Sequence, residues 1–128
     1  MTGEILFYVL IALLVLISVR RFIMNRSVTH YSVPEVSEKI QTNRGVFLLD
    51  VRTEKEWSQG HIKGAHHIPL NELARRSSEL DKHKNREIIC YCQTGNRSIR
   101  AALRLKRLGF STANMKGGIA EWNFQNRL

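Results

Sequence analysis

Short apolar runs of strand length alternate with amphipathic stretches from Ser32 to the end of the chain. The apolar runs predict buried strands over residues 46–49, 65–68, 88–92 and 112–115. The segments between them predict helices over residues 32–40, 54–59, 72–80 and 97–108, and a last helix after residue 118. This alternation predicts an α/β domain whose helices pack on a central, mainly parallel sheet.

Two of these helices carry local start signals. Ser32 and Glu35 form a capping-box pattern, with Pro34 in the first turn. Asn71 is the predicted cap of the helix over 72–80, and the charged residues 81–87 are a predicted loop. Residues 25–29 form a short polar link that precedes the first of these elements.

The first 26 residues differ from the rest, because Ile5–Val19 is apolar and carries no charge. As a helix this run is about 22 Å long, and Phe22–Met24 extend it toward the roughly 30 Å of a bilayer's hydrocarbon core. An acidic residue, Glu4, precedes the run, and the positive charges follow it at Arg20, Arg21 and Arg26. A cleaved signal peptide has the opposite order. We therefore predict an uncleaved membrane anchor over residues 1–26 and a domain over residues 27–128; length and flanking charge disfavour a buried core helix.

The flanking charges also predict an orientation. Arginines beside a membrane span stay on the cytoplasmic side. The protein is therefore expected to cross the membrane once, with its N-terminus outside and the domain in the cytoplasm. In that reducing compartment a free cysteine thiol persists.

The chain is strongly basic, with a formal net charge of +9. The helix predicted over residues 97–108 is crowded with basic residues, namely Arg97, Arg100, Arg104, Lys106 and Arg107. No aromatic residues interleave with these charges to stack on bases, so nucleic-acid binding is not expected. Attraction to anionic lipid near the anchor and a plain solvated helix face both remain open.

Cys92 is the strongest candidate for chemistry. It ends a predicted strand, and the turn-forming loop Gln93–Asn96 leads from it into a predicted helix. Backbone N–H groups of such a loop converge on an anion, and with Arg97 they should lower the pKa of the thiol. A thiolate held in this way is a nucleophile. The alternative, a small buried hydrophobic residue, is disfavoured by the polar loop and by Arg97.

A second cysteine, Cys90, lies on the same predicted strand. Side chains two residues apart on a strand share a face about 7 Å apart, too far for an undistorted disulfide, so Cys90 is expected to pack in the core. A metal site that combines both cysteines with His66 and His67 lacks the paired CxxC spacing of such sites. We predict no metal.

The cysteine loop belongs to a longer pattern. Its first half is Leu49-Asp50-Val51-Arg52, Glu56-Trp57, Gly60-His61-Ile62, Gly64-Ala65 and Ile68-Pro69. Its second half is Cys92-Gln93-Thr94-Gly95-Asn96-Arg97-Ser98, Ala101-Ala102, Leu108-Gly109-Phe110 and Gly117-Gly118 followed by Trp122. In this order, over roughly residues 28–124, these motifs resemble the rhodanese (sulfurtransferase) domain.

The resemblance implies a rhodanese-like three-layer α/β/α sandwich that acts as a sulfurtransferase. In this activity Cys92 takes the outer sulfur of a donor such as thiosulfate and becomes a persulfide, and a thiol or protein acceptor then removes that sulfur. The loop amides from Gln93 to Ser98 cradle the persulfide, and Arg97 attracts the anionic donor. No cofactor is needed.

Three upstream residues are expected to support the site. Asp50 and Arg52 end a predicted strand near Cys92, and the resemblance suggests a structural ion pair with the surrounding loops rather than substrate contacts. His61 is expected to order the loop over residues 60–64 rather than to act as a base, because a thiolate activated by its own loop needs none.

Two other functions are possible for this pattern. The first is a phosphatase or arsenate reductase of related fold, whose loop holds one more residue between cysteine and arginine to fit a tetrahedral oxyanion. Four residues separate Cys92 from Arg97 in this chain, which favours sulfur. The second is a non-catalytic binding module with a rhodanese-like surface, which the complete loop disfavours.

Overall fold

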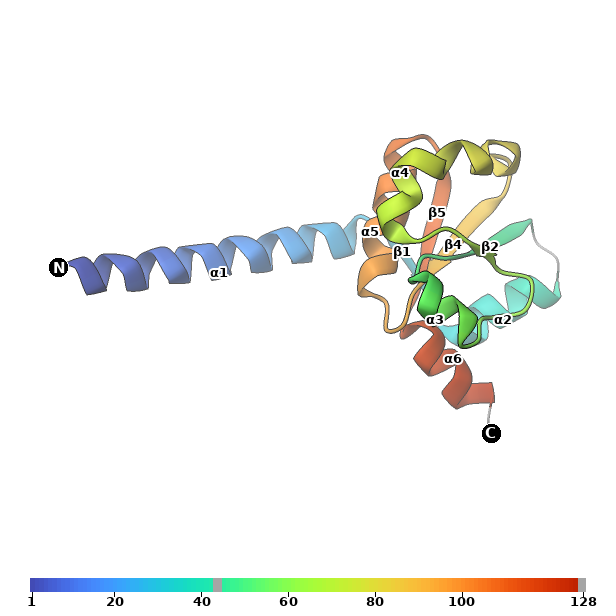
Figure 1. Cartoon of the computed structure of the whole chain (residues 1–128), viewed down its shortest axis with the longest axis horizontal. Coiled ribbons are helices and arrows are strands. Elements are labelled where there is room, and N and C mark those ends of the chain that lie inside the picture. Colours follow the sequence, from blue (N-terminus) through green and yellow to red (C-terminus); the bar gives the residue numbers. More distant parts are fainter. Residues whose placement is uncertain (43–44, 127–128) are drawn as a thin grey trace.

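The computed structural model describes residues 1–42 and 45–126, and it consists of one long helix and an α/β domain (Figure 1). The long helix, α1, spans Thr2–Arg26. The strands are β1 (Thr29–Tyr31), β2 (Val46–Asp50), β3 (His66–His67), β4 (Glu87–Tyr91) and β5 (Ser111–Met115). The helices of the domain are α2 (Val33–Gln41), α3 (Glu54–Ser58), α4 (Leu73–Arg76), α5 (Asn96–Arg107) and α6 (Gly118–Asn126), with 3-10 turns η1 (Leu70–Glu72) and η2 (Ser77–His83).

The described strands form one sheet in the order β1-β5-β4-β2-β3, and every pair in it is parallel. The parallel sheet predicted from the sequence is therefore confirmed. In the central pair Leu49 lies opposite Cys90, and Asp50 lies opposite Tyr91. The carboxyl ends of β2 and β4 consequently meet at one edge, where open α/β sheets bind ligands.

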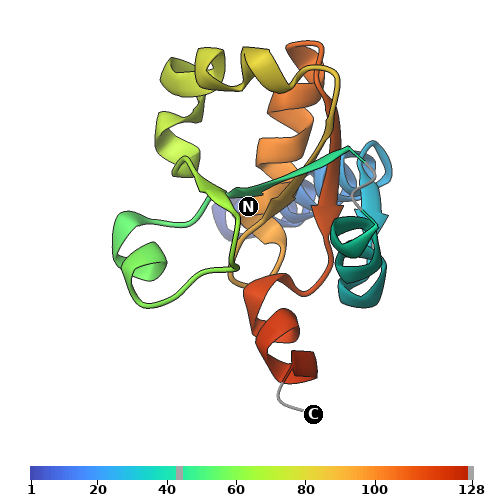
Figure 2. The same ribbon diagram turned by 90° about the vertical axis from the view of Figure 1, so that its right-hand side faces the viewer.

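Alternation along the central strands sends side chains to two separate cores. Leu49 and Cys90 pack with residues of α4, η2 and α5 on one face. Leu48 and Ile89 pack with residues of α2 and α6 on the other. Figure 2 shows helices on both sides of the sheet, which is the predicted three-layer arrangement. Because both faces are covered, the central strands read as continuous apolar runs.

Two helices begin at capping boxes. At α2 the Ser32 N–H donates to the Glu35 carboxylate at 2.6 Å, and the Glu35 N–H donates back to Ser32 Oγ at 3.4 Å. At α3 Thr53 and Glu56 form the same reciprocal pair, at 3.2 and 3.3 Å. The first box was predicted from the sequence. The second fixes the backbone that carries Glu56, which also contacts Arg97 beside the cysteine loop.

Two predictions about local structure were wrong. Thr29 was assigned to a polar link, but it begins the edge strand β1, which pairs with β5. The helix predicted over 72–80 with Asn71 as its cap instead starts at Leu70 without a side-chain cap and continues as η1, α4 and η2 to His83. Its first turn is closed by the Glu72 N–H, which donates to the Pro69 carbonyl at 2.9 Å. The fixed φ of Pro69 therefore sets this start.

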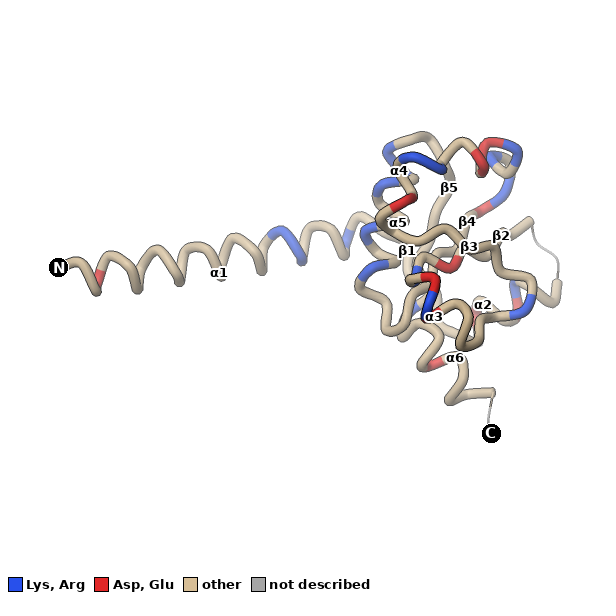
Figure 3. Tube along the Cα trace, viewed as in Figure 1, with Lys and Arg blue, Asp and Glu red and all other residues tan. Residues whose placement is uncertain are grey.

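Helix α1 extends away from the domain and buries none of its side chains (Figure 1). Its 25 residues make it about 37 Å long, longer than the apolar run that predicted it. It is the one described helix that is long and apolar enough to cross a membrane, with a mean hydropathy of 2.4 over its most apolar window. Basic residues gather at its end nearest the domain and on α5 (Figure 3).

The two cores make a direct stability prediction. Ile89 is fully buried in the central strand β4, so Ile89→Ala should lower the free energy of unfolding by about 2–5 kcal/mol. Ile40, on α2, is 38% exposed, so Ile40→Ala should cost less than about 1 kcal/mol. Chemical denaturation followed by tryptophan fluorescence measures both. Equal losses for the two variants would contradict the assignment of the core.

Candidate active site

Cys92 follows the last residue of β4 and is almost completely buried at 1% exposure. Its loop turns into α5 through Gly95, whose φ of +113° favours glycine. The first turn of α6 holds the loop from outside: the Ile119 N–H donates to the Cys92 carbonyl at 2.9 Å, and the Ala120 N–H donates to the Gln93 carbonyl at 3.1 Å. The loop carbonyls therefore point outward, and its N–H groups are free to face the sulfur.

Gly118 makes this close approach possible. A Cβ atom at this position would overlap the carbonyl oxygens of Cys92 and Gln93, and its φ of +61° favours glycine as well. The Gly117-Gly118 pair in the sequence is thus a packing requirement of the cysteine loop, not only a turn before the last helix.

Neutral hydrogen-bond donors surround the Cys92 sulfur. The Gly95 N–H donates to Sγ at 3.0 Å, and Ser98 Oγ lies 3.3 Å from it. Burial alone would raise the pKa of this thiol, but the Ser98 hydroxyl and the N–H groups of Ser98, Gly95 and Thr94 outweigh that effect and lower the pKa below its ordinary value. Among the described residues Cys90 has no such donors, and burial raises the pKa of its thiol strongly. The pKa values of the two thiols are therefore shifted in opposite directions.

Arg97 does not point at the sulfur as its position in the sequence suggested. Its guanidinium donates to both carboxylate oxygens of Glu56, at 2.7 and 2.8 Å. Arg97 and Cys92 still interact electrostatically, but the main groups that lower the pKa of Cys92 are the neutral hydroxyl and N–H groups of its own loop. The Arg97 hydrogen bonds lower the pKa of Glu56 to about 2. This ion pair joins α3 to the start of α5.

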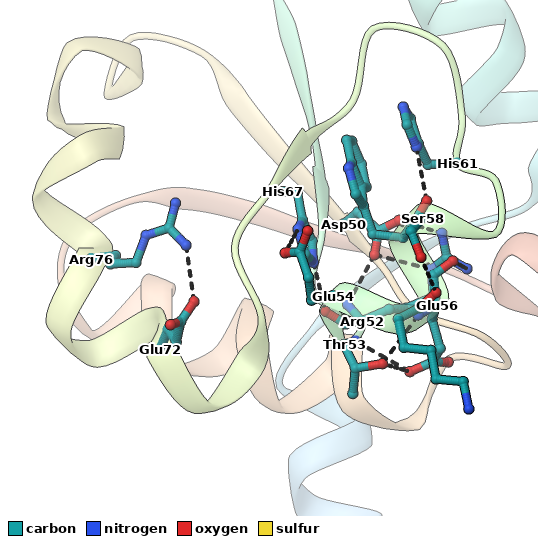
Figure 4. A network of polar contacts seen from close by, with 12 residues as sticks. Asp50, Arg52, Thr53, Glu54, Glu56, Ser58, His61, His67, Glu72 and Arg76 are labelled. Atoms are coloured by element: carbon teal, nitrogen blue, oxygen red, sulfur yellow. Dashed lines mark hydrogen bonds and ion pairs between the residues drawn. The ribbon is translucent and has the colours of Figure 1, made fainter.

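Asp50 and Arg52 form the expected ion pair, and it is buried (Figure 4). Arg52 Nη2 donates to Asp50 at 2.7 Å and to the Gly60 carbonyl at 2.8 Å. The Tyr91 hydroxyl accepts the Ile62 N–H at 3.2 Å. These bonds tie the loop after α3 to the ends of β2 and β4. A buried pair of this kind fixes geometry more than it adds stability.

His61 lies in the same loop (Figure 4). It stacks on Trp57 with ring centroids 3.4 Å apart. Its Nδ1 lies 3.1 Å from the Trp57 carbonyl, which accepts the hydrogen bond. Cys92 is not among the hydrogen-bond partners of His61 in the described part of the chain. This geometry agrees with a loop-ordering residue, although its role stays a prediction.

Other predicted loop residues are divided between exposed and buried positions. Gln93, Thr94 and Asn96 are exposed, whereas Gly95 and Ser98 are buried against the sulfur. Sequence reasoning missed Asn114, which accepts the Ser98 hydroxyl proton, and His30, which contacts Asn114. No local signal marks either residue, because β1 was not predicted and strand pairing brings them together. Across residues 1–42 and 45–126 no group of three or more His, Cys, Asp or Glu side chains is arranged to hold a metal.

Cavities lie on both sides of the cysteine loop. One of about 320 Å³ is lined by Gln93 and by residues of the α3 loop, including Arg52, Glu56 and His61. Another of about 360 Å³ is lined by Thr94 and Gly95 together with His30, Asn114 and Lys116. A third, of about 400 Å³, carries three arginines: Arg97, Arg100 and Arg104. A ligand can therefore approach the cysteine loop through cavities whose lining residues differ in charge.

The sequence model of the Rhodanese-like domain family matches residues 32–125. The chain belongs to the rhodanese-like family. A sulfurtransferase of Allochromatium vinosum is 34% identical over 88 residues, which cover 68% of this chain and 80% of that protein. A Bacillus subtilis protein named for a sulfur-carrier role (YrkF) is 37% identical over 97 residues, 71% of this chain, and the chain spans only 51% of that protein.

Solved rhodanese structures agree with this assignment. A rhodanese-related protein from Thermoplasma volcanium superimposes with a TM-score of 0.69 at 28% identity, over 76% of this chain and 92% of that one. The rhodanese fold predicted from the motifs is therefore confirmed, and the relatives support sulfur transfer as its general activity.

The Glu56–Arg97 pair predicts a pH dependence of stability. The pKa of Glu56 falls from 4.5 to about 2 on folding, so its carboxylate stabilises the fold above pH 4.5 and that contribution is lost as the pH falls toward 2. For a pair about a quarter exposed, solvent screening reduces the contribution to about 1–2 kcal/mol. Between pH 6 and pH 3, Glu56→Gln should therefore lose less unfolding free energy than the wild type.

The control is Glu38→Gln, because Glu38 is exposed on α2 and makes no ion pair among the described residues. Its stability should follow the wild-type pH curve. A Glu56→Gln curve parallel to the wild type from pH 6 to pH 3 would contradict the ion-pair assignment.

Proposed function

We propose that the protein is a membrane-anchored, single-domain sulfurtransferase that moves a sulfane sulfur from a donor such as thiosulfate to a nucleophilic acceptor through a persulfide on Cys92. The observation that carries the proposal is the ring of polar groups around Sγ: the Gly95 N–H donates to it at 3.0 Å, and the Ser98 hydroxyl, which either donates to the sulfur or accepts from it, lies 3.3 Å away. Such a ring stabilises a thiolate before attack and as a leaving group afterwards. Sulfurtransferase relatives support the same reaction class.

The reaction proceeds in two displacements. The Cys92 thiolate gives an electron pair to the outer sulfur of thiosulfate, the S–S bond of the donor breaks, and its electron pair leaves with sulfite. An acceptor thiolate then attacks the outer sulfur of the persulfide, and the Cys92 thiolate is restored. The first step leaves the persulfide anion on Cys92 and the second restores its thiolate, and the loop N–H groups stabilise the negative charge of both. No external oxidant or reductant is required.

Attraction of the anionic donor by Arg97 stays part of the proposal, because Arg97 lines the cavity of about 400 Å³. Arg100 and Arg104 line the same cavity and make no ion pair among the described residues, so we propose that they add to this attraction. Arg97 also keeps α3 against the cysteine loop through its pairing with Glu56. An acceptor in the form of a thiol or a protein is supported by the relative named for sulfur carriage.

Sulfur fits the loop better than phosphate does. Four residues separate Cys92 from Arg97, and the donors lie close around a single sulfur atom. The tetrahedral oxyanion of a phosphatase needs a wider loop. The same argument disfavours arsenate reduction. A non-catalytic binding module would not need a thiol whose pKa is lowered by built-in donors.

Anchoring by α1 completes the proposal. Its apolar side chains are exposed from Ile5 to Ile23, which is unfavourable in water and favourable in a bilayer. We infer that the domain end lies in the cytoplasm, because Arg20, Arg21 and Arg26 would each cost a few kcal/mol inside the membrane and basic residues beside a span stay on the cytoplasmic side. The domain limits are residues 1–26 for the anchor and 27–128 for the rhodanese-like part.

Incubation with thiosulfate should add one sulfur atom, about 32 Da, to Cys92, because this thiol combines a lowered pKa with an anion-binding loop. Intact-mass analysis of the full chain measures the adduct. Cys92→Ser should abolish it, and Cys90→Ser should retain it. An adduct that survives Cys92→Ser, or rapid hydrolysis of an aryl phosphate that Cys92→Ser removes, would sink the proposal.

The proposed topology is tested with introduced cysteines, so that labelling depends neither on the burial of Cys90 nor on the acidity of the Cys92 thiol. In a Cys90→Ser, Cys92→Ser background, Thr2→Cys should react with a membrane-impermeant thiol reagent in intact cells. Ser78→Cys, at an exposed position of the domain, should react only after the membrane is opened. The reverse pattern would move the domain to the outside.

A further inference from the structure

A chain of hydrogen bonds leads from the Cys92 sulfur through four further residues to the end of α1. Sγ lies 3.3 Å from Ser98 Oγ, and the Ser98 hydroxyl donates to Asn114 Oδ1 at 2.5 Å. Asn114 Nδ2 lies 3.2 Å from His30 Nδ1, and His30 Nε2 lies 2.8 Å from the Asn25 carbonyl oxygen. The chain joins α5, β5, β1 and α1, and its middle is buried: Ser98 is 0% and Asn114 2% exposed.

The far end of the chain fixes its direction. A carbonyl oxygen only accepts, so His30 carries its proton on Nε2 and donates it to Asn25. His30 Nδ1 is then an acceptor, and it takes a hydrogen bond from Asn114 Nδ2. This holds the Asn114 amide in one orientation, with Oδ1 directed at Ser98. His30 therefore decides which end of the amide faces the active site.

Ser98 has one hydroxyl proton and two possible acceptors. While it donates to Asn114, its oxygen lone pairs face Cys92, which suits a thiol that donates its own S–H. A thiolate requires the opposite, a Ser98 proton directed at the sulfur. Formation of the thiolate therefore takes the Ser98 proton away from Asn114 and leaves Oδ1 unsatisfied in a buried position, which is costly.

We propose that Asn114 is a positioning residue: its amide, held by His30, takes the Ser98 hydroxyl proton and thereby sets how easily Cys92 loses its own proton. This deepens the proposed function and rests on Cys92 as the reactive thiol.

Other charged and titratable groups surround the two ends of this chain. Lys116 lines the same cavity as His30, and Lys106 donates to the Ser27 carbonyl beside β1. Cys90 and Arg97 interact electrostatically with Cys92, and Asp50 interacts with Arg97. None of them is a partner of Ser98 or Asn114 in the described hydrogen bonds, so variants of Asn114 and His30 leave them in place.

The test measures ionisation of Cys92 in the full chain, in detergent, with Cys90→Ser as background. Thiolate absorbance and the iodoacetamide alkylation rate are recorded against pH. Asn114→Ala should lower the pH of half-ionisation and raise the thiolate-to-thiol ratio about tenfold, because Ser98 is freed. His30→Ala should act in the same direction by about threefold, and Ser98→Ala should act in the opposite direction. Asn126→Ala, an exposed asparagine on α6, is the matched control and should change nothing.

A second measurement needs no substitution. Nitrogen chemical shifts of the His30 ring in the reduced protein should show the proton on Nε2. A proton on Nδ1, an Asn114→Ala profile equal to that of Asn126→Ala, or a higher pH of half-ionisation in Asn114→Ala would overturn the proposal. These readouts follow proton loss and not sulfur transfer, so a failure of the persulfide experiment is distinguished from a failure of this one.

Discussion

A thiolate can be buried only where hydrogen-bond donors replace the water that it loses, and the cysteine loop is built around that constraint. The N–H groups face Sγ because the loop carbonyls are turned outward. The first turn of α6 stabilises this arrangement, since its N–H groups donate hydrogen bonds to those carbonyls. Gly118 allows the two backbones to touch. The last helix is therefore part of the site, although the hydrogen-bond partners of Sγ in the described part of the chain, Gly95 and Ser98, lie outside it.

Two ion pairs hold the surroundings of this loop, and they act in different ways. Asp50–Arg52 is buried and ties the α3 loop to the ends of the central strands. Glu56–Arg97 is partly exposed and joins α3 to the start of α5. Glu56 also closes the capping box of α3, so one carboxylate fixes both the start of a helix and the arginine of the cysteine loop. The groups around the sulfur itself are neutral. Because they carry no charge of their own, they do not compete with an incoming anion for nearby cations.

The parts that the sequence predicts correctly are those fixed by local rules or by a complete motif. Continuous apolar runs of strand length identify β2 and β4, and the Ser32–Glu35 box identifies α2. The edge strand β1 is not predicted, because its three residues of mixed polarity give no periodic pattern. The direction of the Arg97 side chain is not predicted from the sequence either, since its partner Glu56 lies 41 residues away and only the fold brings the two together. Asn114 and His30 meet for the same reason, across the β1–β5 pairing.

The missed strand β1 matters for the proposed anchoring. Val28 is buried and Lys106 donates to the Ser27 carbonyl, so α1 enters the sheet through a short, held connection and not through a flexible tether. The last turns of α1 and the start of α5 line a common cavity of about 650 Å³ that carries Arg21 and Arg100. In the proposed topology this places the basic face of α5, and with it the Thr94–Asn96 side of the cysteine loop, toward the bilayer surface. A protein acceptor would therefore approach Cys92 from the opposite side of the loop, where Gln93, Glu56 and His61 line the cavity of about 320 Å³.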